Sequence, residues 1–282
     1  MDLLPGGYWD AGGRLHRDFE LTALTGHEEE LLSRPGQSAR LVTEVLSRCV
    51  RRLGGLGPVT PAIARELLVA DRHYLLLQLR RGTFGDLVRA DLVCPWPDCG
   101  RRVSLTFSLD QVPVEEAREQ AATYTLWLGG TEVTFRLPNG GDQEELAELL
   151  AHDEAEATTR LLARCLLRLG TDGPPDRARV SALPAADRAA IEARMAELAP
   201  RVEQTMQAEC AECRRTFLAP FDVQRFFLGD LRIEGEQLYH EVHYLAYHYH
   251  WSEREIMEMT RERRRTYIDV LSETIEVLNG GA

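Results

Sequence analysis

The apolar residues between positions 39 and 53 recur at intervals of three and four, which predicts an amphipathic helix. The stripe comprises Leu41, Val42, Val45, Leu46, Cys49, Val50 and Leu53. Gly54-Gly55 follows it and marks the end of this helix. A second helix is expected after Asp71, which can serve as its cap. From Val103 to Leu109 apolar and polar residues alternate, which is typical of a strand.

This pattern occurs twice in the chain. When the sequence is shifted by 116 residues, positions 39–72 align with 155–188 without a gap, and 15 of the 34 aligned residues are identical. Ordinary residue usage would give roughly two or three identities. Cys49 aligns with Cys165, and both fall in the apolar stripe as small packed side chains. The sequence therefore predicts an internal duplication of a helical unit.

Two cysteine pairs lie far apart in the sequence, Cys94 with Cys99 and Cys210 with Cys213. Each pair can direct two thiolates at one point, and two such pairs make a tetrahedral zinc site. At the same shift of 116 residues Cys94 aligns with Cys210, so each half would contribute half of the site. We expect one structural Zn²⁺ in a zinc ribbon that joins the two halves.

The remaining elements are a hairpin and further helices. Residues 123–137 alternate around Gly129-Gly130, which predicts two strands and a tight turn. Helices are expected over 142–169 and 187–208. In the C-terminal region, which has no evident counterpart in the first half, we expect one helix over 235–247 and a second one capped by Ser252 and Glu255.

Together these elements predict an α+β fold, mainly α, with duplicated helical halves joined by a central zinc ribbon and a β-hairpin, and a C-terminal helical segment. The expected segments are an irregular N-terminal arm at 1–18, a first repeat at 19–112, a hairpin linker at 113–141, a second repeat at 142–228 and a C-terminal helical partner-binding segment at 229–282.

Composition narrows the choice of function. The 282 residues carry a formal net charge of −12, and all 33 basic residues are arginine. This balance argues against non-specific binding to nucleic acid or anionic membranes, which requires a positive field. The chain shows no apolar stretch long enough to span a bilayer and no signal peptide, so we expect a cytoplasmic protein. Its six cysteines then indicate metal ligands or core thiols rather than disulfides.

The C-terminal region is rich in histidine, aromatic and arginine side chains. One interpretation is a second metal site or an acid–base centre among the histidines. The other, which we favour, is helix packing or partner contact, because aromatic side chains with one polar end suit an interface. The arginines at 261–265 would lie on a solvated face or pair with Glu255, Glu258 and Glu262. The alternative is that they bind a carboxylate-rich partner surface. The candidate partner-binding residues are His243, Tyr247, His250, Trp251, Arg264 and Arg265.

No catalytic set emerges from the sequence. Gly54-Gly55-Leu56-Gly57 lacks the Lys-Ser/Thr that completes a phosphate-binding loop, and neither a G-x-S-x-G elbow nor an H-E-x-x-H helix occurs. A closed four-thiolate site offers no open position for chemistry. We therefore expect a protein that is not an enzyme.

Three stretches resemble a known family. The C-terminal stretch Glu241–Tyr267, with the outline E-V-H-x-L-A-x-x-Y-H-W-S-E-x-E-I followed by R-R-x-Y, resembles the baseplate hub assembly chaperones of T-even-type phages and contractile injection systems. Residues 24–32 and 135–142 are similar to larger, zinc-ribbon-bearing relatives. The simple phage members lack the duplicated zinc body. The resemblance implies a cytoplasmic, non-enzymatic factor that helps the baseplate hub or central spike to assemble.

Two other functions stay open on the sequence. One is a structural baseplate subunit that remains in the finished particle. The other is a nucleic-acid-binding zinc-ribbon protein, against which the net charge of −12 and the few basic residues near the cysteines count.

Overall fold

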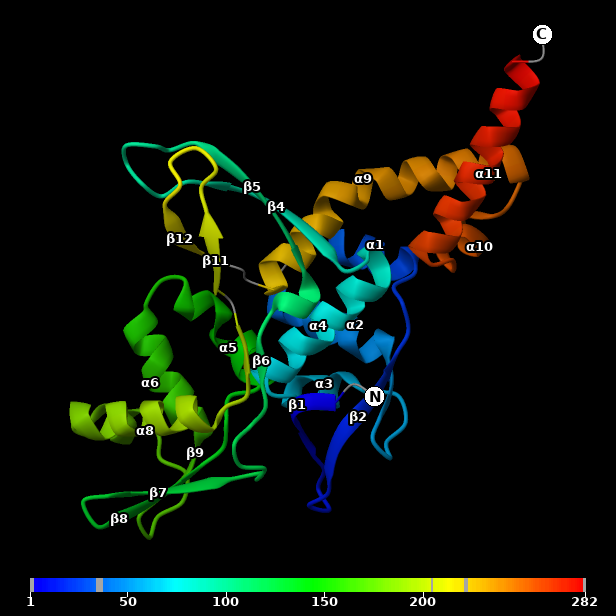
Figure 1. The fold of residues 1–282 in the computed structure, drawn as a ribbon. Coiled ribbons are helices and arrows are strands. Elements are labelled where there is room, and N and C mark those ends of the chain that lie inside the picture. The colour runs from blue at the N-terminus through cyan, green and yellow to red at the C-terminus, as the bar shows by residue number, and fades with distance from the viewer. Residues whose placement is uncertain (1–2, 34–37, 204, 221–222, 281–282) are drawn as a thin grey trace. The chain divides into compact units, whose positions relative to one another are not determined.

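The computed structural model describes residues 3–33, 38–203, 205–220 and 223–280 (Figure 1). The fold is α+β and mainly helical, with small sheets of two or three strands, as the sequence predicts. The chain forms two compact units, each assembled from three separate segments. The first unit holds the segments up to Glu20, Val42–Leu75 and Pro113–Val202, and the second holds Leu21–Leu41, Leu76–Val112 and the segment from Glu203 onward.

The first unit contains two small sheets of the same design. In each sheet, the two strands of a hairpin lie next to a short third strand. In the chain, this third strand directly follows a helix. The sheets have the orders β1-β2-β3 and β7-β8-β9. Their strands are β1 (Leu3–Trp9), β2 (Leu15–Leu21), β3 (Val50–Leu53), β7 (Tyr124–Leu128), β8 (Thr131–Phe135) and β9 (Leu166–Leu169). The predicted hairpin around Gly129-Gly130 is β7-β8, and both glycines have the positive φ that its two-residue turn needs.

The expectation of an irregular N-terminal arm at 1–18 is wrong. Most of residues 3–21 form the β1-β2 hairpin. The glycines that suggest a loop instead form an irregularity within β1. There the backbone N–H groups of Gly6 and Gly7 donate to the buried carboxylate of Asp71, at 2.8 and 2.9 Å. A long-range contact of this kind leaves no local signal in the sequence.

Both apolar stripes that predict single helices are divided in the structure. The first forms α2 (Ser38–Cys49) and then β3, and the second forms α6 (Glu154–Cys165) and then β9. The last four residues of each stripe are strand because they pair with a hairpin. The helices that follow are α3 (Pro61–Glu66), α4 (Val69–Phe84), α7 (Arg177–Ser181) and α8 (Ala185–Leu198).

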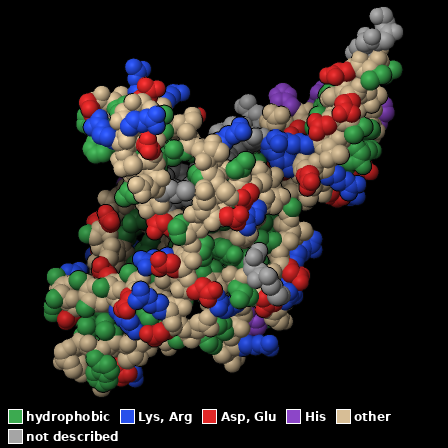
Figure 2. All heavy atoms as spheres, viewed as in Figure 1, with side chains coloured by type: hydrophobic (Ala, Val, Ile, Leu, Met, Phe, Trp, Pro, Cys, Tyr) green, Lys and Arg blue, Asp and Glu red, His purple; other side chains and the backbone are tan. Residues whose placement is uncertain are grey.

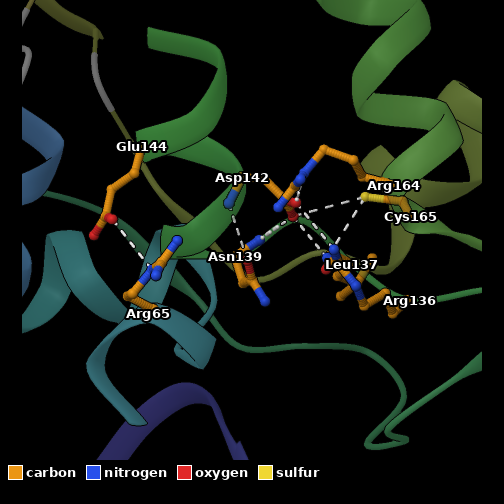
Figure 3. Close-up of polar contacts among 8 residues, drawn as sticks. All are labelled: Arg65, Arg136, Leu137, Asn139, Asp142, Glu144, Arg164 and Cys165. Atoms are coloured by element: carbon orange, nitrogen blue, oxygen red, sulfur yellow. Dashed lines mark hydrogen bonds and ion pairs between the residues drawn. The ribbon is translucent and has the colours of Figure 1, made fainter. Parts of the chain in front are cut away.

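The helix α5 (Gly140–Leu150) follows β8, and its start is fixed by a capping box. The side chain of Asn139 accepts from the N–H of Asp142, and the Asp142 carboxylate accepts from the N–H of Asn139. Arg136 and Arg164 also bind this carboxylate, at 2.6 and 2.7 Å (Figure 3). The strands β6 (Val114–Glu115) and β10 (Arg201–Val202) pair with each other and complete the first unit.

The second unit contains two long hairpins and the C-terminal helices. It includes α1 (Gly26–Ser33), β4 (Leu87–Val93), β5 (Arg102–Ser108), a 3-10 turn at Leu109–Gln111, β11 (Thr205–Glu209), β12 (Thr216–Pro220), α9 (Val223–Tyr249), α10 (Glu253–Met257) and α11 (Arg261–Gly280). The helix predicted over 187–208 ends at Leu198, and its last residues belong to β10 and β11. The predicted capping box of Ser252 and Glu255 begins α10.

Each unit has apolar cores of its own. In the first, side chains of β7, β8, β9, α6 and α8 form one cluster, in which Val133, Phe135 and Cys165 are completely buried. In the second, α9, α10 and α11 enclose a cluster around Leu245 and Ile256. A third, small cluster surrounds Cys94 and Cys210 at the tips of the two hairpins.

Candidate metal centre

The four cysteines singled out by the sequence converge in the second unit. Their Sγ atoms all lie within 4.8 Å of one another. The Sγ atoms of Cys94 and Cys213 are 3.8 Å apart, and so are those of Cys99 and Cys210. Four thiolates at the usual Zn–S distance of about 2.3 Å in a tetrahedron lie about 3.8 Å from one another. The residues present are therefore compatible with a tetrahedral metal ion.

The backbone of the two hairpins explains this convergence. In the first, β4 leads into the turn and the N–H of Cys94 donates to the carbonyl of Arg101 at 2.8 Å. In the second, the N–H of Cys210 donates to the carbonyl of Arg215 at 3.1 Å. The residue after the second cysteine of each pair, Gly100 or Arg214, has a positive φ. Each turn therefore folds back so that both of its sulfur atoms point the same way.

The protein surroundings act on the cysteine pKa values in both directions. Burial raises the pKa of Cys94 to about 12. A backbone hydrogen bond from Arg215 is the main factor that lowers the pKa of Cys213 to about 7. The Arg215 guanidinium also lies over the Trp96 ring, 4.9 Å from its centroid, and pairs with Asp98 at 2.5 Å. A bound divalent cation would hold all four sulfurs as thiolates, because the thiolate is the metal ligand.

The histidine and aromatic residues near the end of α9 are brought together by packing. Trp251 stacks on Tyr249 with ring centroids 4.6 Å apart, and it meets the edge of Tyr267 at 4.8 Å. His243 and Tyr247 are exposed and stack on each other one helical turn apart. Within the part of the chain that the structure describes, the group able to hold a metal is the four cysteines and includes none of these histidines.

The predicted partner-binding residues divide into two groups in the structure. His243, Tyr247, His250 and Arg265 are exposed, and Trp251 is half-buried in its aromatic stack. The expectation of a solvated face is wrong for Arg264, whose side chain is completely buried. Its guanidinium binds Glu29 of α1 and Glu241 of α9.

This buried arginine cluster, which also includes Arg261 at 3.7 Å from Glu29, was not among the features expected from the sequence. By composition alone, the four arginines between positions 261 and 265 indicate a basic stretch on the surface. The signal that could find the cluster is spacing, because Arg261 and Arg264 occupy one helix face with Ile268. Their carboxylate partners on α1 and α9 are distant in sequence.

Comparison with known proteins adds one match. Residues 15–228 match the model of a family described as T4 bacteriophage base plate protein. The matched region contains all four cysteines, both hairpins that carry them, and the stretches 24–32 and 135–142. The C-terminal stretch Glu241–Tyr267 lies outside it. No curated protein and no solved structure matches the chain.

Proposed function

The chain belongs to the T4 bacteriophage base plate protein family, and from this premise we propose that it is a non-enzymatic assembly factor for the hub or spike of a phage-tail or contractile-injection-system baseplate. Family membership supports a role related to the phage baseplate and partners among tail and baseplate proteins. Acting as a chaperone, the protein would bind its client in the cytoplasm and leave before the particle is complete. None of the described helices is both apolar and long enough for a membrane span.

The observation that carries this proposal is the exposed histidine and aromatic surface at the end of α9. Tyr247 is 68% exposed, and His243 and His250 are exposed beside it. In Figure 2 histidine side chains gather along the C-terminal helices. The helix is held beneath this surface by the Trp251 stack and by buried Arg264. A large aromatic ring with a polar end, exposed on a rigid base, is well suited to contact a protein partner.

We also propose that the four cysteines hold one structural Zn²⁺. Four sulfur ligands in a tetrahedron are the usual arrangement of a structural zinc site. The ion would join the β4-β5 and β11-β12 hairpins, which are distant in sequence but belong to the same unit. With all four positions taken by protein sulfur, the ion has no open site for a substrate, in keeping with a non-enzymatic role.

A structural subunit retained in the baseplate is the second candidate, because the family description, a base plate protein, is equally compatible with that role. Nucleic-acid binding has less support. Acidic and basic side chains are interspersed over the face shown in Figure 2, and the net charge is −12. A nucleic-acid-binding surface would need a field of one sign.

The test is a co-purification of the tagged full-length protein from its native lysate, with nuclease added to a parallel sample, together with immunoblots of purified particles. An assembly factor captures hub or spike proteins regardless of nuclease and is absent from finished particles. Tyr247→Ala should reduce this capture at least tenfold with an unchanged melting temperature.

Val277→Ala is the matched control, because Val277 is 75% exposed on α11 and should leave capture intact. Presence of the protein in finished particles would instead establish the retained subunit. Capture that disappears with nuclease would establish nucleic-acid binding and reject both baseplate functions.

A further inference from the structure

One local arrangement occurs three times in the part of the chain that the structure describes. A side chain caps a short helix by accepting from the N–H three residues on, and an arginine follows the cap by 12 residues. The N–H of each arginine donates to the carbonyl four residues before it, at 3.0 to 3.1 Å. The caps and arginines are Thr60 with Arg72, Asp176 with Arg188, and Ser252 with Arg264. The C-terminal region therefore has a counterpart in the first half, contrary to the expectation from sequence.

The start of α5 covers the first of these arginines. The N–H of Gly140 donates to the carbonyl of Leu67 at 3.0 Å, and a Cβ on Gly140 would lie 2.2 Å from Nη1 of Arg72. Glu144, one turn further on, pairs with Arg65 at 3.1 Å (Figure 3) and accepts from the Thr43 hydroxyl. That hydroxyl in turn accepts from Arg72 at 2.8 Å. The arginine is thereby buried under an acidic helix start.

The start of α1 covers the third arginine in the same way. The N–H of Gly26 donates to the carbonyl of Met259 at 3.3 Å, and a Cβ on Gly26 would lie 2.8 Å from the sulfur of Met257. Glu29 binds Arg264 with both carboxylate oxygens. Leu67 and Met259 occupy equivalent positions, each five residues before its arginine.

The two covering helices begin with the same sequence pattern. Residues 25–30 read Thr-Gly-His-Glu-Glu-Glu, and residues 139–144 read Asn-Gly-Gly-Asp-Gln-Glu. In both, glycine follows the first residue, the carboxylate of the fourth residue accepts from the N–H of the first, and the sixth residue is glutamate. Glycine is required because the helix start lies against the arginine-bearing segment, and the acids match its positive charge.

Within the described part of the chain, no helix start covers the second arginine, Arg188. A groove of about 490 Å³ lies over it, lined by Glu154, Ala155, Thr158, Thr159, Leu162, Arg188 and Glu192. The Nε of Arg188 is buried and has no hydrogen-bond partner among the residues that the structure describes. Thr159, which corresponds to Thr43, donates to its own helix at the Ala155 carbonyl. Among the described residues, no backbone N–H donates to the carbonyl of Leu183, the equivalent of Leu67 and Met259.

We propose that the groove between α6 and α8 binds the N-terminal turn of an acidic helix from a partner protein, one that begins Asn/Thr-Gly-x-Asp/Glu-x-Glu. Its glycine N–H would bond the Leu183 carbonyl, and its last glutamate would accept from the Thr159 hydroxyl beside Arg188, as Glu144 accepts from the Thr43 hydroxyl that Arg72 binds. Both helices of this kind in the chain are already seated over Arg72 and Arg264, so the occupant comes from another protein. This surface is separate from the one at Tyr247 and goes beyond the proposed function.

The acidic residues of the groove are compatible with such an occupant. Glu154 and Glu192 line it, and neither forms an ion pair with Arg188 within the described part of the chain. In the third copy, Arg264 binds Glu241 of α9 together with Glu29 of the covering helix. One guanidinium can therefore serve a carboxylate of the groove and one of the partner, because it has five donors in a fork.

A direct test uses a labelled peptide with the sequence of residues 137–151, which carries the start of α5. A staple across the exposed positions of Glu145 and Glu148 holds it helical, since a free peptide of this length is marginal. Fluorescence anisotropy with the full-length protein should show saturable binding. Arg188→Met in the protein, or Glu144→Gln or Gly140→Val in the peptide, should each weaken binding at least tenfold.

Two further protein variants decide where the peptide binds. Ala155→Trp fills the groove, keeps Arg188 and should abolish binding, and Arg194→Met on the same α8 should leave binding unchanged. A dissociation constant of about 1 mM marks a weak complex. Failure of the peptide to bind the wild-type protein at protein concentrations up to about 1 mM would therefore overturn the proposal. Unchanged binding by Ala155→Trp would also overturn it, because the peptide would then have replaced α5 or α1 in its own groove. A dimer of the chain that Ala155→Trp dissociates would identify the occupant as a second copy and reject a separate partner.

Discussion

The guanidinium of Arg264 holds the carboxylate of Glu29 with two hydrogen bonds from Nη2, at 2.9 and 2.8 Å, across 235 residues of sequence. Its Nε donates at the same time to Glu241 at 2.9 Å. Burial raises the pKa of Glu29, and the positive charge of Arg264 opposes this rise. One guanidinium thus binds two buried carboxylates, with Arg261 3.7 Å from Glu29 as a second cation, and it connects α1, α9 and α11.

Arg264→Met should therefore destabilise the protein strongly, by about 3–5 kcal/mol, because it leaves two buried carboxylates with less compensation. Urea unfolding monitored by circular dichroism measures this loss. Arg254→Met serves as the control, because Arg254 is 81% exposed and its pair with Glu258 at 3.5 Å lies in solvent. Equal stability of the two variants would show that Arg264 has no such structural role.

Replacement of a metal ligand should separate metal binding from core packing. Cys94→Ser is expected to lose the bound metal, and its melting temperature should fall by roughly 10 °C or more, since structural metal binding contributes free energy of folding. Elemental analysis of the purified protein should find one equivalent of zinc in the wild type and none in the variant.

The matched control for this substitution is Cys49→Ala. Cys49 is 2% exposed, lies on α2 and belongs to the first unit, whereas the four cysteines belong to the second. This variant should lose stability through the smaller side chain yet keep one equivalent of zinc. Wild-type protein without zinc, and with a melting temperature insensitive to chelators, would contradict the structural zinc site.

The four-cysteine site could be predicted from the sequence because a local signal marks each half. Each cysteine pair is a short motif, and the shift of 116 residues places Cys94 on Cys210. The structure brings all four sulfurs within 4.8 Å, so the prediction that they converge is confirmed. The mainly helical α+β class follows from periodicity in the same way.

Other features could not be predicted because they depend on long-range contacts. The strand character of residues 50–53 comes from their sheet with the N-terminal hairpin, and the burial of Arg264 comes from Glu29 and Glu241. In the C-terminal copy of the cap and arginine, the sequence signal is limited to Ser252 and Arg264, because the residues around them share little identity with the other two copies. Their equivalence becomes evident through shared backbone hydrogen bonds and through the helices that cover them.

The pH dependence of stability should report on Asp71, which is completely buried and accepts from the N–H groups of Gly6 and Gly7. Burial raises its pKa to about 6, although those two hydrogen bonds act in the opposite direction. The pKa of an unfolded-chain aspartate is about 3.9. Between these values the folded protein binds more protons than the unfolded chain, so this group stabilises the fold at low pH and loses that contribution as pH rises through 6.

The difference of about two pKa units corresponds to about 3 kcal/mol. Asp71→Asn removes the titrating group, so the unfolding free energy of the wild type relative to this variant should be larger at pH 4 than at pH 7 by about that amount. Urea unfolding at both pH values measures the difference, and Asp269→Asn, at an exposed position on α11, controls for the loss of one carboxylate. A relative stability that stays constant from pH 4 to pH 7 would mean that the Gly6 and Gly7 hydrogen bonds outweigh burial and hold Asp71 ionised.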